Sequence, residues 1–172
     1  MAMVEAARAR DSVLLIAPTG GGKTLAGFLP SLMELAAAPR AGLHTLYVSP
    51  LKALATDIAR NLTTPVDEMG LPVGIETRTG DTPANRRKRQ KDAPPNLLLT
   101  TPESLALLLS QEDAPVLFAG LQTIVVDEVH ALAGTKRGDQ LALGLARLTV
   151  IAPGARRVGL SATVAHRRAL LD

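Results

Sequence analysis

Residues 17–24 read A-P-T-G-G-G-K-T, and this run constrains the fold more than any other part of the chain. It follows the apolar residues 13–16 and precedes an amphipathic stretch over residues 25–35, which predicts a strand, a loop and a helix. In such a loop the backbone N–H groups converge on phosphates, and the helix N-terminus adds partial positive charge. The run therefore predicts a nucleoside triphosphate site formed by Thr19, Gly20, Gly21, Gly22, Lys23 and Thr24.

Two side chains of this loop carry the expected chemistry. Lys23 is placed to reach the outer phosphates, and the Thr24 hydroxyl is placed to ligate Mg²⁺. Ala17 stands where the strict pattern has glycine, and alanine is tolerated there if its φ is negative. The alternative is a glycine-rich turn that binds no ligand.

Composition limits the class of protein. The 172 residues, 47% of them hydrophobic, suffice for one folded domain. The net charge of +3 is too small to indicate nucleic-acid binding by itself, and scarce aromatic residues disfavour binding by base stacking. There is no cysteine and hence no disulfide or thiolate metal site, which is compatible with a reducing cytoplasm. We find no signal peptide and no run of about 18 apolar residues, so we expect no membrane partner.

Six short runs have the character of strands, and most of them are continuously apolar. That pattern is typical of strands buried on both faces of a parallel sheet. Four helical patterns lie between them, of which we expect the second to break near Pro65. The alternation predicts an α/β layered domain with right-handed crossovers. The predicted strands cover residues 13–16, 45–48, 73–77, 96–99, 123–126 and 157–160, and the predicted helices cover residues 25–38, 51–69, 104–110 and 139–150.

Small polar or glycine-bearing clusters follow these strands. In a parallel open sheet the carboxyl ends of the strands meet at one edge, where ligands bind. We therefore expect the chemistry of the chain to gather at that edge, although it is scattered in sequence. The clusters cover residues 18–24, 49–52, 78–81, 100–103, 127–130 and 161–163.

Asp127 and Glu128 close the apolar strand over residues 123–126. Two carboxylates at the end of a buried strand are costly unless something compensates them, and Mg²⁺ with a triphosphate would do so. We assign Asp127 to the metal and Glu128 to activation of the attacking water. The alternative is a solvated acidic turn.

His130 follows the acidic pair by two residues and is a candidate link to Ser161 and Thr163 at the end of the last strand. The competing interpretations are a structural histidine and an ordinary helix N-cap, which serine and threonine favour. Each of two basic segments also allows two interpretations. Residues 86–91 and 136–138 can be solvated helix surface or phosphate contacts, and for the first we prefer the helix surface.

Taken in order, these motifs resemble the first-lobe motifs of superfamily 2 helicases, and more closely those of the Lhr-type, large helicase-related branch. S-P-L-K-A-L-A at residues 49–55, R-T-G-D-T at residues 78–82, T-P-E-S at residues 101–104, D-E-V-H at residues 127–130 and K-R-G at residues 136–138 carry the resemblance. The bacterial ligase-associated DExH-box branch is the most similar in our interpretation.

The resemblance implies a three-layer RecA-like P-loop NTPase domain in a bacterial, cytoplasmic protein that moves along DNA with ATP and Mg²⁺, in DNA repair. It implies that Lys23, Thr24, Asp127 and Glu128 run ATP hydrolysis, and that His130, Ser161 and Thr163 couple the nucleotide state to a second lobe. It implies backbone contacts to single-stranded DNA from three loops, with no base specificity. Their residues are Pro50, Leu51, Lys52, Arg78, Thr79, Gly80, Thr101, Pro102 and Glu103.

Relative to that family pattern, we expect residues 1–172 to be a first RecA-like lobe truncated at both ends, without the second lobe and its arginine finger. Related nucleotidases lose on the order of 10³–10⁵ in rate without that arginine, so we expect weak Mg·ATP binding and very slow hydrolysis by the lobe alone. A nucleotide-dependent binding switch that does not unwind, an RNA helicase lobe and a small-molecule kinase are the alternatives. Glu128 and residues 161–163 argue against the switch, and the D-E-V-H segment fits a kinase poorly.

Overall fold

A computed structural model describes residues 12–16 and 22–162, and it contains six strands in one sheet. The strands are β1 (Val13–Ile16), β2 (Thr45–Val48), β3 (Ile75–Arg78), β4 (Leu97–Thr100), β5 (Thr123–Val126) and β6 (Arg156–Ser161). Their order is β1-β6-β5-β2-β4-β3, and every pairing is parallel. The expected parallel sheet is confirmed, and all carboxyl ends lie at one edge.

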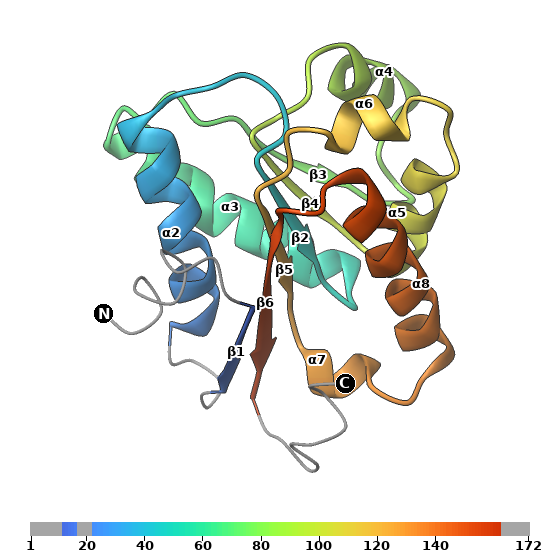
Figure 1. Ribbon diagram of the computed structural model, residues 1–172. Helices are drawn as coiled ribbons and strands as arrows, with labels where there is room; N and C mark the ends of the chain where they lie inside the picture. Colours follow the sequence, from blue (N-terminus) through green and yellow to red (C-terminus); the bar gives the residue numbers. More distant parts are fainter. Residues whose placement is uncertain (1–11, 17–21, 163–172) are drawn as a thin grey trace.

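Helices cover both faces of this sheet (Figure 1). On one face lie α2 (Lys23–Ala37) and α3 (Lys52–Glu68), and on the other lie α5 (Pro102–Leu109), α6 (Ala114–Phe118) and α8 (Lys136–Ile151). The short helix α7 (Val129–Leu132) follows β5, and α4 (Ala84–Asp92) follows β3. The three-layer α/β architecture expected from the sequence is therefore confirmed.

Side-chain alternation along the strands divides the core into two halves. In β2, Leu46 and Val48 pack with the α5–α8 side, whereas Tyr47 packs with α2 and α3. In β5, Ile124 and Val125 divide in the same way. Because both faces are covered, the strands need no polar face, which is why their sequences are nearly continuous apolar runs.

The predicted break of the second helix near Pro65 is wrong, because α3 continues through Pro65 to Glu68. Pro65 lies in the last turn, so its missing N–H removes one helical hydrogen bond, and Asn61, the residue four positions before it, is exposed to water. Leu62 and Val66 are both buried against the sheet. Their packing outweighs the loss of that bond.

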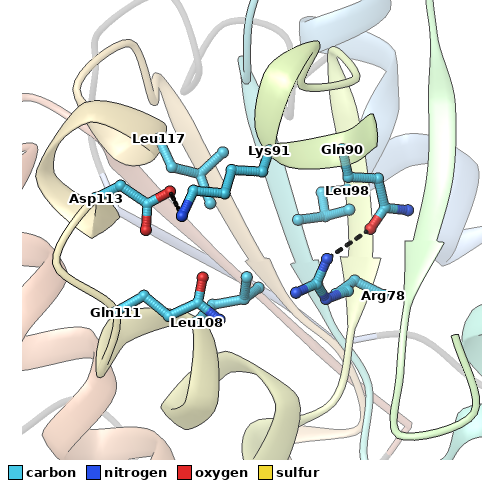
Figure 2. Close-up of a pocket in the computed structure, with 8 residues that line it drawn as sticks. All are labelled: Arg78, Gln90, Lys91, Leu98, Leu108, Gln111, Asp113 and Leu117. Atoms are coloured by element: carbon cyan, nitrogen blue, oxygen red, sulfur yellow. Dashed lines mark hydrogen bonds and ion pairs between the residues drawn. The ribbon is translucent and has the colours of Figure 1, made fainter. Parts of the chain in front are cut away.

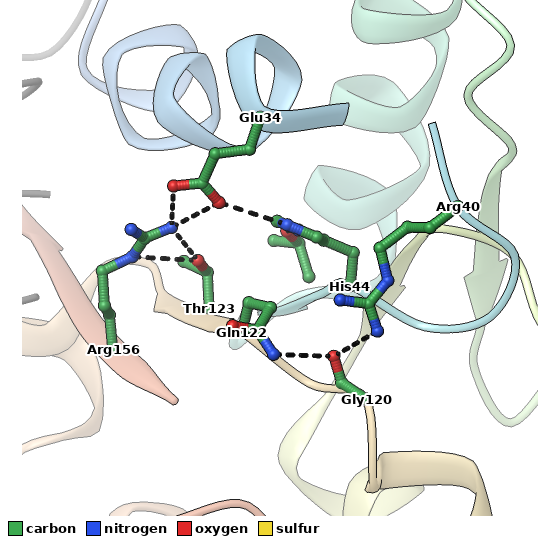
Figure 3. A network of polar contacts seen from close by, with 8 residues as sticks. Glu34, Arg40, His44, Gly120, Gln122, Thr123 and Arg156 are labelled. Carbon is green, nitrogen blue, oxygen red and sulfur yellow. Dashed lines mark hydrogen bonds and ion pairs between the residues drawn. The ribbon is translucent and has the colours of Figure 1, made fainter. Parts of the chain in front are cut away.

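A polar network ties α2 to the amino ends of the strands, at the edge opposite the predicted site (Figure 3). Arg156 Nη2 lies 2.7 and 2.8 Å from the two carboxylate oxygens of Glu34 and donates to Thr123 Oγ1 at 2.9 Å. His44 Nε2 lies 3.2 Å from Glu34 Oε2, and His44 Nδ1 lies 2.8 Å from Thr45 Oγ1. The network anchors the C-terminal half of α2 to β2, β5 and β6.

This network makes stability depend on pH through His44. Burial lowers the pKa of His44, against an opposing effect of the Glu34 carboxylate. The unfolded chain, with an ordinary histidine pKa of about 6.5, then binds more protons than the folded chain, so the free energy of unfolding falls as the pH drops below that value. We expect His44→Gln to lose less stability than the wild type between pH 7.5 and 5.5 in urea unfolding. An equal loss in both proteins would contradict the assignment.

Candidate nucleotide and nucleic-acid sites

The start of α2 is built to receive an anion. Gly22, at the N-cap of α2, has a φ of 68° and ψ of 15°, a left-handed conformation that glycine adopts without strain, and its carbonyl accepts from Ala26 N at 3.0 Å. Lys23 follows at once and is 7% exposed. Within the described part of the chain, its Nζ is buried without any hydrogen-bond partner.

A buried, unpartnered ammonium is costly, and a phosphate group would compensate it. The residues present therefore fit the triphosphate that the sequence predicts. Thr24 lies in the first turn of α2, beside Lys23. Thr19, Gly20 and Gly21 lie outside the described residues.

Asp127 lies directly after β5 and is 2% exposed. Its Oδ2 accepts a hydrogen bond from the Tyr47 hydroxyl, and its Oδ1 accepts from Glu128 N at 2.8 Å. The Asp127 backbone N–H continues the sheet by donating to Val48 O at 2.9 Å. The carboxylate is thus held at the carboxyl edge by donors on both oxygens.

Glu128 has a φ of 48° and a ψ of 45°, and it is the one non-glycine residue with a positive φ in the described part of the chain. Such a conformation costs about 1–3 kcal/mol and accumulates at functional sites. It ends the strand and begins α7 at Val129. The Glu128 side chain is 24% exposed, with its Oε2 3.3 Å from His130 Nε2.

His130 connects Glu128 to β6. Its Nδ1 lies 3.1 Å from Ser161 Oγ, while its Nε2 faces Glu128. The expected link from His130 to Ser161 is thus present as a contact, and the coupling role remains a prediction. Thr163 lies outside the described residues. No group of three or more His, Asp or Glu residues among residues 12–16 and 22–162 could hold a metal by itself, so a Mg²⁺ here would need phosphate oxygens and Asp127.

A groove beside this site gathers three loops that are far apart in sequence. It is lined by Pro50, Leu51 and Lys52 before and at the start of α3, Gly80 after β3, and Thr101, Glu103, Ser104 and Leu107 in or beside α5. Arg137, the second residue of α8, completes the lining. Six of the nine residues predicted to contact nucleic acid therefore lie in one groove.

The other three of the nine do not line it. Thr79 and Pro102 are buried beside it, and Thr79 N donates to Thr82 Oγ1 at 2.9 Å. Arg78 points into a small separate pocket, where its Nη1 donates to Gln90 Oε1 at 3.2 Å and to Arg87 O at 3.1 Å (Figure 2). Burial lowers the pKa of Arg78. Arg78 is partly exposed and, with Thr79 and Gly80, also lines a hollow that adjoins the groove, so its contact with a phosphate stays a prediction.

Charged pairs tie the loops of the groove to one another. Lys52 Nζ lies 3.0 Å from Asp81 Oδ1, joining the start of α3 to the loop after β3. Arg137 Nη2 lies 3.2 Å from Glu103 Oε2 and also donates to the carbonyl of Pro50. The hydrogen bond from Arg137 holds the pKa of Glu103 below its ordinary value.

Sequence reasoning missed this role of Arg137, although residues 136–138 were noted as a basic segment. Gly138, the last residue of this segment, has a structural reason of its own. A Cβ on Gly138 would lie 2.1 Å from Leu132 O, so only glycine fits there, and its N–H bonds to Thr135 Oγ1 at the N-cap of α8. The Arg137 side chain, one residue earlier, contacts Glu103 of α5.

The basic segment at residues 86–91 lies in α4, which confirms the preferred helix. Several of its side chains have structural partners. Arg87 donates to Gly80 O and Thr82 O at 2.7 Å each, Arg89 pairs with Glu76, and Lys91 lies 2.9 Å from Asp113 (Figure 2). Arg87 therefore supports the loop after β3, while Arg89 and Lys91 tie α4 to β3 and to the start of α6.

Comparisons with known proteins agree with this geometry. The sequence profile of DEAD/DEAH box helicases matches residues 1–170. The chain is 48% identical over 168 residues to the Lhr helicase/probable uracil glycosylase of Mycolicibacterium smegmatis, which covers 90% of this chain and 11% of that protein. It is 42% identical over 169 residues to ATP-dependent helicase Lhr-Core protein 2 of Thermococcus barophilus, a match that covers 90% of this chain and 20% of that protein. The chain thus spans at most a fifth of the length of these relatives.

Solved structures show the same similarity. The structure of Mycobacterium smegmatis helicase Lhr bound to ssDNA and AMP-PNP matches with a TM-score of 0.86 and 46% identity, over 96% of this chain and 22% of that one. The structure of DUF1998 helicase MrfA bound to DNA and AMPPNP matches with a TM-score of 0.85 and 28% identity, over 98% of this chain and 24% of that one.

Proposed function

The chain belongs to the DEAD/DEAH box helicase family, and from that premise we propose that it is the ATP-binding lobe of an Lhr-type, ATP-dependent DNA translocase. The observation that carries the proposal is the buried Lys23 ammonium, unpartnered among the described residues, at the same sheet edge as Asp127 and Glu128. An ammonium, a buried carboxylate and a second carboxylate in a strained conformation form a set that Mg·ATP would complete.

In this proposal Lys23 binds the outer phosphates, and Thr24 and Asp127 hold Mg²⁺, which neutralises phosphate charge. Glu128 orients the attacking water and accepts its proton. The two ring nitrogens of His130 face Glu128 and Ser161. His130 thereby connects Glu128 to the end of β6. A second lobe of the full-length protein would supply the arginine that completes catalysis.

The groove at Pro50–Lys52, Gly80 and Thr101–Glu103 is proposed to bind the backbone of single-stranded DNA. Its lining is largely apolar, and its polar groups include the Lys52 amine, the Arg137 guanidinium and the hydroxyls of Thr101 and Ser104. These groups can contact phosphates, and the lining contains no aromatic residue for base stacking. The related helicases bound to ssDNA or DNA support DNA over RNA.

Further parts of the proposal rest on resemblance alone. They are a role in DNA repair, a connection to a DNA ligase, and a bacterial cytoplasmic location. The described helices include none long and apolar enough to cross a membrane. Co-purification of the full-length protein with a ligase would support the proposed connection.

The test of the function measures ATP hydrolysis by the full-length protein with no nucleic acid, with single-stranded DNA and with single-stranded RNA. We expect DNA to stimulate hydrolysis more than RNA. Stimulation by RNA alone would identify an RNA helicase lobe, and nucleotide binding without stimulated hydrolysis would identify the switch module.

Replacing Arg137 with alanine tests the groove. We expect about three- to tenfold weaker binding of single-stranded DNA, because the Glu103 carboxylate then faces the phosphates uncompensated and the Pro50 carbonyl loses its donor. Fluorescence anisotropy of a labelled oligonucleotide measures this. Arg60→Ala removes an equal charge from the exposed face of α3 and is the matched control. An equal effect of the two substitutions would mean that net charge alone matters.

A further inference from the structure

Tyr47 is the one phenol in the buried strand β2, whose other residues are Thr45, Leu46 and Val48. It is fully buried, and in the parallel register of β2 and β5 it lies opposite Val125, two residues before Asp127. Its hydroxyl crosses to the neighbouring strand end and donates to Asp127 Oδ2. A buried phenol usually finds a hydrogen-bond partner, but here that partner is the carboxylate that the proposed function assigns to Mg²⁺.

The hydroxyl determines how that carboxylate is oriented. Glu128 N holds Oδ1 from the following peptide group, and Tyr47 holds Oδ2 from another strand. Two donors on two oxygens restrict rotation of the carboxylate and leave its remaining lone pairs for a cation. Metal affinity depends on partners of this kind, which orient ligands without touching the metal.

The ring of Tyr47 also contacts the helix that carries the phosphate-binding lysine. It stacks on Phe28 of α2 with the ring centroids 5.2 Å apart and the planes at 29°. Phe28 lies five residues after Lys23 on the same rigid helix. The Phe28–Tyr47–Asp127 contacts therefore connect the two halves of the nucleotide site through the core.

We propose that Tyr47 is a positioning residue of the nucleotide site, whose hydroxyl holds the Asp127 carboxylate in the orientation that binds the metal of Mg·ATP. The inference rests on the proposed function for the identity of the ligand. The ring of Tyr47 fills the core, and its hydroxyl sets the Mg²⁺ concentration that nucleotide binding requires. A phenylalanine at this position would keep the packing of the ring and lose the hydrogen bond to Asp127.

The experiment titrates Mg²⁺ into full-length protein with a fluorescent ATP analogue and compares wild type with Tyr47→Phe. We expect the Mg²⁺ concentration for half-maximal binding to rise about tenfold, the effect of losing a hydrogen bond to a charged group. Binding of the analogue in EDTA should be unchanged. Ser31→Ala is the matched control, because it removes a buried hydroxyl from α2 that has no partner among the described residues; it should leave the Mg²⁺ requirement unchanged.

A double-mutant cycle with Asp127→Asn separates positioning from general loss of structure. If Tyr47 acts through Asp127, adding Tyr47→Phe to Asp127→Asn changes the Mg²⁺ requirement little. Additive effects, or an unchanged Mg²⁺ requirement in Tyr47→Phe with normal wild-type binding, would overturn the inference. If the wild type binds no Mg·nucleotide, the proposed function itself fails, so the two failures are distinguishable.

Discussion

Replacing Glu128 with glutamine is expected to lower the rate of ATP hydrolysis by the full-length protein on the order of 10³-fold, with little change in Mg·ATP binding. Glutamine has nearly the same size and can still accept a hydrogen bond from His130, but it cannot take a proton from water. General base catalysis contributes about 10²–10⁴ in rate. Single-turnover hydrolysis in the presence of single-stranded DNA measures the chemical step directly.

The matched control is Glu68→Gln, at the exposed end of α3, which changes charge equally and lies outside the site. It should hydrolyse ATP at the wild-type rate. A Glu128→Gln variant that retains a rate within tenfold of wild type would show that another group accepts the proton. A variant that loses ATP binding would show that Glu128 contributes to binding of ATP and not only to the chemical step.

The second large effect concerns Lys23→Met, which we expect to change binding and stability in opposite directions. Binding of Mg·ATP should weaken about 100-fold, because the charge-assisted bonds to the phosphates are lost. The nucleotide-free protein should become more stable by about 1 kcal/mol. Methionine has a similar length and fills the same space without burying a charge, and the Lys23 ammonium has no partner among the described residues.

Titration with a fluorescent ATP analogue and urea unfolding without nucleotide measure the two parts. Lys88→Met, on the exposed surface of α4, controls for the loss of one positive charge. A fall in nucleotide-free stability for Lys23→Met would mean that the ammonium is compensated within the folded chain.

Much of the fold was predictable because the sheet is buried on both faces. Three predicted strands, over residues 13–16, 45–48 and 123–126, have the observed bounds, and the others are shifted or extended by one or two residues. Continuous apolar runs between polar clusters allow few other arrangements. The elements that the sequence did not predict are short or depend on tertiary contacts. Helix α4 was expected only as a helix surface over residues 86–91, without bounds, and α6 and α7 were not placed. The packing of Leu62 and Val66 carries α3 through Pro65.

The candidate site was predictable only as a set of strand ends. Parallel strands place their carboxyl ends together, so the clusters at Lys23, Asp127 and Ser161 had to meet at one edge. Which side chains would touch was not predictable. Tyr47 and Asp127 are 80 positions apart, and nothing in an aliphatic strand pattern marks a phenol as the partner of a carboxylate.

The sequence by itself determined the parallel sheet and the edge at which the polar clusters gather, because local periodicity and strand direction specify them. The tertiary structure decided the contacts made across that edge. It joined Arg78 to Gln90 and Glu103 to Arg137, and it connected Tyr47 to Asp127. These pairings depend on strand register and helix packing, which are set by the whole core and are not encoded in any one segment.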